Sequence, residues 1–340
     1  MLHDSGTVII GRNEGERLTR CLRSVSDSGR KVVYVDSGST DGSVQSAAAA
    51  GCEVVRLLPS SPFTAARARN AGFERLLRLQ RDLDFVQFVD GDCELDAGWL
   101  DRAERELRER PDAGIVCGVL TERSPSSSIY NRLCQMEWKG SIGEVDECGG
   151  IFMVRVSAFC AARGFRPDMI GGEEPDLCLR LRQAGWKVVR VAAAMATHDA
   201  AMTTLAQWSR RAVRYGYACA ARQGRTWTRS MASSLAWGGV LPAAMVASLA
   251  AATLMPQALA VAGLIAAAYG VLALRVYRFR CRFYDDPADA ALYAVFCVLS
   301  KLPQCWGMWT YWTGRHAEVK SRPSVERAVV ESATGGALNQ

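Results

Sequence analysis

The sequence lacks any charged residue between Ser230 and Leu274. A membrane-spanning helix needs about 20 apolar residues, so this stretch can cross a bilayer twice, with a turn near Pro256. Two buried helices of a soluble protein are the alternative. Pro242 and the glycines of the stretch are tolerated in membrane helices and unfavourable in soluble ones. We therefore predict a transmembrane helical hairpin over residues 230–274.

Several other patterns are also missing. The apolar run near the N-terminus is too short for a secretory signal peptide. The 12 cysteines form no C-x-x-C pair and no zinc-type spacing, so we expect reduced thiols rather than disulfides or structural zinc. No G-x-G-x-x-G follows the first predicted strand, which disfavours an NAD-dependent enzyme.

Basic residues flank the uncharged stretch on both sides. They are Arg222, Arg225 and Arg229 before it, and Arg275, Arg278, Arg280 and Arg282 after it. The positive-inside rule then predicts an inner (plasma) membrane protein whose remaining chain lies on the cytoplasmic side. The net charge of +6 fits these clusters beside anionic lipids better than nucleic acid, so we expect no nucleic-acid partner.

A second apolar region covers residues 288–313 and is rich in tryptophan. Lys301 and Pro303 interrupt it. A third span would place the basic residues of the tail outside, so we predict an interfacial amphipathic segment over residues 285–314. Residues 315–340 are predicted to be a polar tail.

Residues 5–215 alternate short apolar runs with amphipathic ones. Strands are predicted at residues 7–10, 31–35, 53–55, 85–89, 114–120, 151–156 and 187–191, and helices at 16–26, 43–50, 65–81 and 174–184. This alternation predicts an α/β domain with a Rossmann-like, mixed and mostly parallel sheet that helices cover on both faces.

The run FVQFVDGDCEL, residues 85–95, combines a buried strand with two acids. Asp90 and Asp92 follow the strand at the end where open α/β sheets hold their ligands. Two carboxylates on one tight turn repel each other unless a cation that prefers oxygen ligands lies between them and a polyphosphate. A solvated turn is the alternative for this motif alone.

Four blocks occur in one order: VIIGRNEGERLTRCLRSV, VVYVDSGSTDGS, FVQFVDGDCEL and GGEEPDLCLRLRQAGW. Together they resemble the signature blocks of family 2 glycosyltransferases with the GT-A fold, over about residues 5–215. The resemblance implies a GT-A catalytic domain, here followed by membrane helices. It also implies a nucleoside-diphosphate-sugar donor, UDP- or GDP-linked, and Mg²⁺ or Mn²⁺ as cofactor.

The resemblance implies roles for individual residues. Asn13, Glu14 and Asp36 match positions that line the nucleotide pocket. In AARARNAG the family often places an Arg and an Asn that face the donor. Arg67 and Asn70 are three residues apart and share one helix face, so we assign them to donor binding.

The metal and the base are assigned in the same way. Asp92 is the expected metal ligand, Asp90 is expected to hold the sugar or ribose and to share the metal, and His198 is a further candidate ligand. An inverting transfer needs a base at the acceptor hydroxyl. Glu174 stands where the family usually has Asp, and Glu173 is the other candidate.

These patterns predict a metal-dependent inverting hexosyltransferase in cell-envelope or exopolysaccharide biosynthesis. Its acceptor would be a hydroxyl of a lipid-linked or membrane-proximal saccharide. QWSRR, residues 207–211, has Arg211 where the QxxRW motif of processive synthases has Trp, which argues against polymerisation. A polyprenyl-phosphate glycosyltransferase, a glycosidase with paired carboxylates and a silent membrane scaffold are the alternatives.

Overall fold

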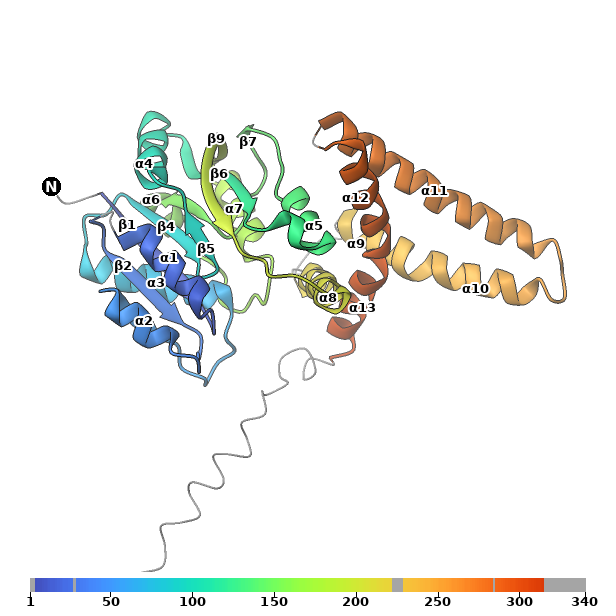
Figure 1. Cartoon of the computed structure of the whole chain (residues 1–340), viewed down its shortest axis with the longest axis horizontal. Helices are drawn as coiled ribbons and strands as arrows, with labels where there is room; N and C mark the ends of the chain where they lie inside the picture. Colours follow the sequence, from blue (N-terminus) through green and yellow to red (C-terminus); the bar gives the residue numbers. More distant parts are fainter. Residues whose placement is uncertain (1–3, 27–28, 222–228, 284, 315–340) are drawn as a thin grey trace, which may run out of the picture.

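The computed structural model describes residues 4–26, 29–221, 229–283 and 285–314. An α/β domain is followed by a group of helices from which one long hairpin projects (Figure 1). The predicted polar tail, the basic residue Arg222 and the basic residue Arg225 lie outside the described residues.

In the described residues, nine strands form a single mixed sheet in the order β3-β2-β1-β4-β8-β6-β9-β5, and β7 pairs with β9. Strands β1 to β4 run parallel, β8 is antiparallel to β4 and β6, and β6 and β9 are parallel. The predicted mixed sheet is thus confirmed. The strands are β1 Ser5–Gly11, β2 Val32–Asp36, β3 Glu53–Arg56, β4 Phe85–Asp90, β5 Cys93–Leu95, β6 Ala113–Glu122, β7 Gly143–Glu144, β8 Phe152–Arg155 and β9 Lys187–His198.

Helices cover the sheet through apolar faces with helical spacing. In α1, Leu18, Cys21, Leu22 and Val25 are buried, which is the i, i+3, i+4, i+7 pattern of one face. The helices of the domain are α1 Glu16–Ser26, α2 Ser43–Ala49, α3 Ala65–Leu79, α4 Trp99–Glu109, α5 Ile129–Glu137, α6 Val156–Ala161 and α7 Glu173–Gln183.

The carboxyl ends of three parallel strands meet at one edge of the sheet. Gly11 of β1 is paired with Asp36 of β2, and Ile10 with Asp90 of β4. This register brings the loops after β1, β2 and β4 together, which is where open α/β sheets bind ligands.

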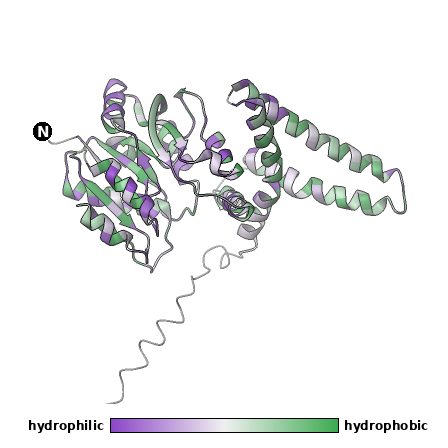
Figure 2. Ribbon diagram, in the orientation of Figure 1, coloured by the Kyte–Doolittle hydropathy of each residue, from purple (hydrophilic) through white to green (hydrophobic). Residues whose placement is uncertain are grey.

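The C-terminal helices include two that are long and apolar enough to cross a membrane, at residues 229–251 and 258–282. Only 11% of each apolar window is buried, unlike the core helix of a soluble protein. Figure 2 shows the projecting hairpin as predominantly hydrophobic. The helices are α8 Leu205–Ala221, α9 Arg229–Leu235, the π-helical turn η2 Ala236–Val240, α10 Leu241–Ala251, α11 Ala258–Phe283, α12 Pro287–Leu299 and α13 Lys301–Trp312.

The hairpin is longer than the predicted 230–274. Helix α11 continues past Leu274 to Phe283, because the Arg residues that end the uncharged stretch are good helix formers and do not stop the helix. The predicted interfacial segment contains two helices, α12 and α13. Its interfacial position remains a prediction, which the exposed side chains of Trp306 and Trp309 support.

Helix α13 packs closely on α8. A Cβ at Gly216 of α8 would lie 1.9 Å from the carbonyl oxygen of Gln304, and one at Gly307 of α13 would lie 2.0 Å from the carbonyl oxygen of Val213. Only glycine permits this separation of the two backbones. The contact joins α13 to α8, the helix that follows the last strand of the sheet.

Candidate active site

Arg69 of α3 lies at the centre of a carboxylate cluster. Its Nη2 donates to Asp90 Oδ1 at 2.8 Å. Its Nη1 donates to Oε1 of Glu173 at 3.0 Å and to Oε1 of Glu174 at 2.8 Å. The Arg69 side chain is 2% exposed, and its guanidinium lies 5.5 Å from the centre of the Phe165 ring. One buried cation therefore joins the end of β4 to the start of α7.

The two glutamates begin α7 after Gly172, whose φ of 76° is in the left-handed region that favours glycine. Carboxylates at a helix N-terminus interact favourably with the helix dipole. Burial nevertheless raises the pKa of Glu174 to about 7; Arg69 opposes the rise, while Glu173 and Asp90 add to it. A carboxylate with a raised pKa is a stronger base, which suits Glu174 to proton transfer.

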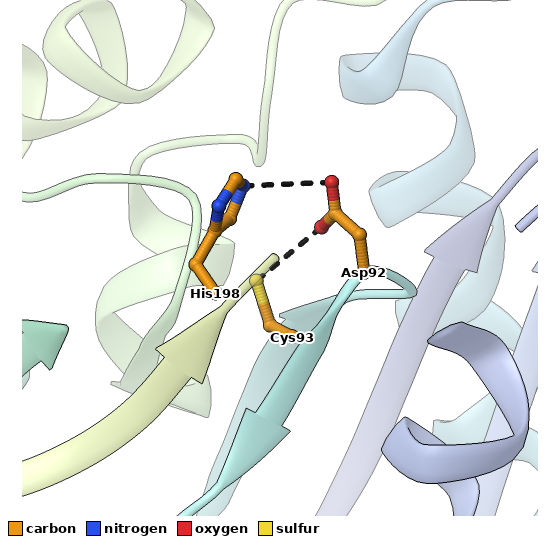
Figure 3. A group of neighbouring side chains, drawn as sticks. All are labelled: Asp92, Cys93 and His198. Carbon is orange, nitrogen blue, oxygen red and sulfur yellow. Dashed lines mark hydrogen bonds and ion pairs between the residues drawn. The ribbon is translucent and has the colours of Figure 1, made fainter. Parts of the chain in front are cut away.

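Asp92 and His198 form a second pair of site residues, and Cys93 lies next to them (Figure 3). The Oδ2 atom of Asp92 is 3.4 Å from Nε2 of His198. The register of the sheet makes this contact, because His198 of β9 is paired with Cys93 of β5 on one side and with Glu122 of β6 on the other. Asp92 precedes Cys93 and therefore reaches the imidazole.

The surroundings of Asp92 and His198 fit a divalent cation. Ligand atoms of Asp92, Cys93 and His198 all lie within 4.8 Å of one another. Nδ1 of His198 is buried and faces Glu122 Oε2 at 3.6 Å, and a carboxylate beside the second nitrogen is the usual partner of a metal-binding histidine. Burial raises the pKa of the Cys93 thiol well above its usual value, so Cys93 stays protonated and donates to Asp92. The carboxylate of Asp92 suits Mg²⁺ or Mn²⁺, and the imidazole of His198 would be the nitrogen donor beside it.

Protonation of the pair depends on neighbouring charges. Burial lowers the pKa of His198, but Glu122 and Asp92 outweigh this effect and raise it. Burial raises the pKa of Asp92, which His198 partly offsets. Asp90 belongs to the Arg69 cluster, and among the described residues it is outside the group of neighbouring metal-ligand atoms.

Three of the predicted nucleotide residues lie at the ends of β1 and β2: Asn13 and Glu14 follow β1, and Asp36 is the last residue of β2. Asp36 is 3% exposed, and its Oδ2 accepts hydrogen bonds from the backbone of Gly38 and Ser39, both at 3.0 Å. Oδ1 of Asn13 accepts from the backbone of Thr40 at 2.7 Å, which links the two loops.

Glu14 lies beside the acidic turn. A Cβ on Gly91 would be 3.2 Å from Cγ of Glu14. Burial and the charge of Asp92 raise the pKa of Glu14, and Arg17, which pairs with it at 2.7 Å, opposes the rise. The structure therefore brings Glu14 together with Asp92.

Arg67 and Asn70 contact neighbouring backbone and not the acids, so their role in donor binding stays a prediction. The guanidinium of Arg67 donates to backbone carbonyls of residues 58, 61 and 62. The side-chain amide of Asn70 donates to the carbonyl of Phe165 at 2.7 Å and accepts from its backbone N–H at 3.0 Å. A spacing of three residues shows that two side chains share a helix face, but it does not show which face is buried. The residue of α3 that contacts Asp90, Glu173 and Glu174 is Arg69.

Two further residues of the site escaped the sequence reasoning. A Cβ on Gly150 would lie 2.5 Å from Arg69 Nη2 and 2.6 Å from Asp90 Oδ2, so only glycine fits against the cluster. Glu122 supports His198 from β6. Neither residue lies in a block that the sequence singles out, and both reach the site through strand pairing and loop packing.

The sheet order, with acids at its carboxyl edge, is an α/β fold of the GT-A type. Among solved structures, a mannosyltransferase from Pyrobaculum calidifontis, in complex with GDP-mannose and Mn²⁺, is similar with a TM-score of 0.55. The two share 18% sequence identity, and the match covers 90% of this chain and 88% of that one. At this identity the likeness concerns the fold.

Residues 7–163 match the model of the family described as "Glycosyl transferase family 2". The chain thus carries a glycosyltransferase family 2 domain. A pre-mycofactocin glycosyltransferase of Mycobacterium tuberculosis is 27% identical over 231 residues, which are 63% of this chain and 46% of that protein. The chain spans about half the length of the curated relatives that it matches.

Proposed function

We propose that the protein is a metal-dependent, inverting glycosyltransferase with residues 5–215 as its catalytic domain. It moves one sugar from a UDP- or GDP-linked donor to a hydroxyl of a lipid-linked or membrane-proximal acceptor. The observation that carries this proposal is Glu174, a base whose pKa is raised to about 7 and which Arg69 holds next to Asp90 at the end of β4. A base with a pKa near the working pH is the most effective in proton transfer.

Glu174 has the role of the base in this proposal. It accepts the proton of the acceptor hydroxyl while the hydroxyl oxygen attacks the anomeric carbon of the donor. The bond from that carbon to the diphosphate oxygen breaks, and the nucleoside diphosphate leaves with the bonding electrons. The side chain of Glu174 is 16% exposed and that of Glu173 is 7% exposed, so Glu174 is the more accessible base and Glu173 positions Arg69.

Asp92 and His198 would hold Mg²⁺ or Mn²⁺, and Glu122 would orient the imidazole. When bound, such an ion neutralises the charge that develops on the leaving diphosphate. The Mn²⁺ in the complex of the Pyrobaculum mannosyltransferase is in keeping with this choice. Asp36, Asn13 and Glu14 would line the nucleoside side, where Asp36 can accept from an N–H of the base.

The setting of the reaction is the cytoplasmic face of the inner membrane. The two apolar helices at residues 229–251 and 258–282 support membrane anchoring. Arg275, Arg278 and Arg282 follow the uncharged part of α11 and suit anionic lipid head groups. Anchoring next to the membrane fits a saccharide acceptor carried by lipid, as in cell-envelope or exopolysaccharide assembly.

Asp92→Asn tests the proposed metal role, with Asp82→Asn, an exposed acid just before β4, as the matched control. Thermal unfolding is followed with UDP or GDP, with and without Mn²⁺. Ligand at about 100 times its dissociation constant stabilises a protein by about 2.7 kcal/mol. We expect a Mn²⁺-dependent rise in Tm with one of the nucleotides in the wild type and in Asp82→Asn. An equal rise in Asp92→Asn would refute the metal role.

A further inference from the structure

A cavity of about 470 Å³ lies between the catalytic domain and the C-terminal helices. Its walls come from α5 and α8 on one side and from α9, α12 and α13 on the other. Figure 1 shows α8, α12 and α13 between the sheet and the projecting hairpin. The volume is within the range of about 300–1,000 Å³ that is usual for small-molecule sites. None of the site residues described above lines it.

The cavity combines aromatic rings with charges of both signs. Trp208 and Phe296 meet edge to face, with ring centroids 5.0 Å apart, and Tyr293 lines the same space. Arg211 forms an ion pair with Glu137 at 2.8 Å, and Lys301 is a further cation of the wall.

This lining indicates a saccharide. The C–H faces of sugar rings pack on aromatic rings, while sugar hydroxyls both donate to carboxylates and accept from cations. An isolated phosphate would find Arg211 already paired with Glu137 and would meet a second negative charge at Glu147, and a bare lipid chain would desolvate these charged groups.

A second cavity of about 230 Å³ extends toward the catalytic acids. It shares Glu137 and Glu147 with the first cavity and is also lined by Trp138 and Gly149. The ring of Trp138 lies 4.7 Å from that of His198. Gly149 precedes Gly150, which touches Arg69 and Asp90. The smaller cavity therefore lies between the larger one and residues that are next to the Arg69 cluster and His198.

We propose that these two cavities are the acceptor site, and that they bind the sugar rings of a lipid-linked saccharide. The larger cavity holds the sugar nearest the lipid, and the smaller one leads the accepting hydroxyl to Glu174. The lipid chain lies along α12 and α13, where the side chains of Val295, Leu299 and Leu302 are exposed. This assignment rests on the proposed function, because it takes Glu174 as the base.

Cysteine protection tests the site without requiring catalysis. Cys297 is half-buried and lines the larger cavity, whereas Cys281 of α11 is exposed outside it. The full chain in phosphatidylcholine nanodiscs is alkylated with N-ethylmaleimide, and both rates are followed by peptide mass spectrometry. The probes are dodecyl maltoside, which has a sugar head, and dodecyl phosphate, which has a phosphate head.

We expect dodecyl maltoside to slow alkylation of Cys297 about tenfold near ten times its dissociation constant, with Cys281 unchanged. Dodecyl phosphate should protect much less. Equal or better protection by dodecyl phosphate would overturn the assignment to a saccharide, and absence of protection by both probes would overturn the site itself. These outcomes do not depend on donor binding, so they are distinct from failure of the proposed function in the nucleotide test.

A cavity-filling variant gives a second measurement. Cys297→Trp occupies the larger cavity, and Cys281→Trp is its matched control. Release of nucleoside diphosphate by transfer to water is measured first for each variant and serves as its own baseline. Dodecyl maltoside acts as the acceptor and should increase the release of nucleoside diphosphate. This increase should be lost in Cys297→Trp and kept in Cys281→Trp. Full stimulation in Cys297→Trp would contradict the proposal.

Discussion

Glu174→Gln should lower activity and raise stability together. The carboxylate has an ordinary pKa of 4.5 and a pKa of about 7 in the folded protein, a rise that corresponds to about 3 kcal/mol. A group with a raised pKa favours folding below its unfolded pKa and loses this contribution as the pH increases through its folded pKa. At pH 8 the wild type therefore carries the cost of a buried, ionised Glu174.

The amide removes that cost and keeps an oxygen that can accept from Arg69, whose other partners are Asp90 and Glu173. Arg69 also loses one opposite charge, which offsets part of this effect. We therefore expect the free energy of unfolding to increase by about 1–3 kcal/mol at pH 8, which corresponds to about 2–12 °C in Tm. At pH 4.5 the difference should be small. Transfer should fall about 10²–10⁴-fold, because a general base contributes this much.

Thermal unfolding in detergent at pH 4.5 and pH 8, without metal or nucleotide, measures the stability effect. Glu109→Gln, an exposed acid at the end of α4, should change Tm little at either pH. A Glu174→Gln variant that is no more stable than wild type at pH 8, or equally stabilised at both pH values, would refute the burial argument. Unimpaired transfer to polyprenyl phosphate would instead favour a phosphate acceptor, which needs no strong base.

Two other parts of the structure give sharp tests. Gly150→Ala should lower the free energy of unfolding by about 1–3 kcal/mol and the transfer activity about 100-fold, because the added Cβ would displace Arg69. Gly149→Ala, with nothing within 4 Å of its Cβ, should leave Tm nearly unchanged. A similar loss of stability in both variants would contradict the close-approach argument. After carbonate washing, the wild-type protein should sediment with the membranes. The double variant Val246→Arg, Leu264→Arg should be released into the supernatant, because each arginine costs about 2.5–3.5 kcal/mol of insertion free energy in a span. A wild type that stays soluble without detergent would rule out the membrane hairpin.

The sequence was sufficient for local features. Helix α1 was predicted at its observed bounds, and the strand before Asp90 ends one residue later than predicted. Both follow from hydrophobic periodicity, which depends on neighbours in the chain. The apolar hairpin was also predicted from composition, but its end was not, since the first Arg of α11 marks the end of the uncharged stretch and not of the helix.

Contacts between distant residues required the tertiary structure. Helical spacing pointed to Arg67 and Asn70, and only the packing of α3 against α7 shows that Arg69 meets the acids. Likewise His198 could be named as a candidate, but its contact with Asp92 depends on the pairing of β9 with β5.

The sequence by itself thus determined which acids end which strands and where the chain is apolar enough for a membrane, because strand and helix periodicities are local. The tertiary structure decided which groups share a site. Strands that are far apart in the chain pair in the order set by the packing of the whole domain, and this order brings Arg69, Gly150 and Glu122 to the acids. The cavity beside α8 and α13 has the same origin, because its walls come from helices that only the folded chain brings together.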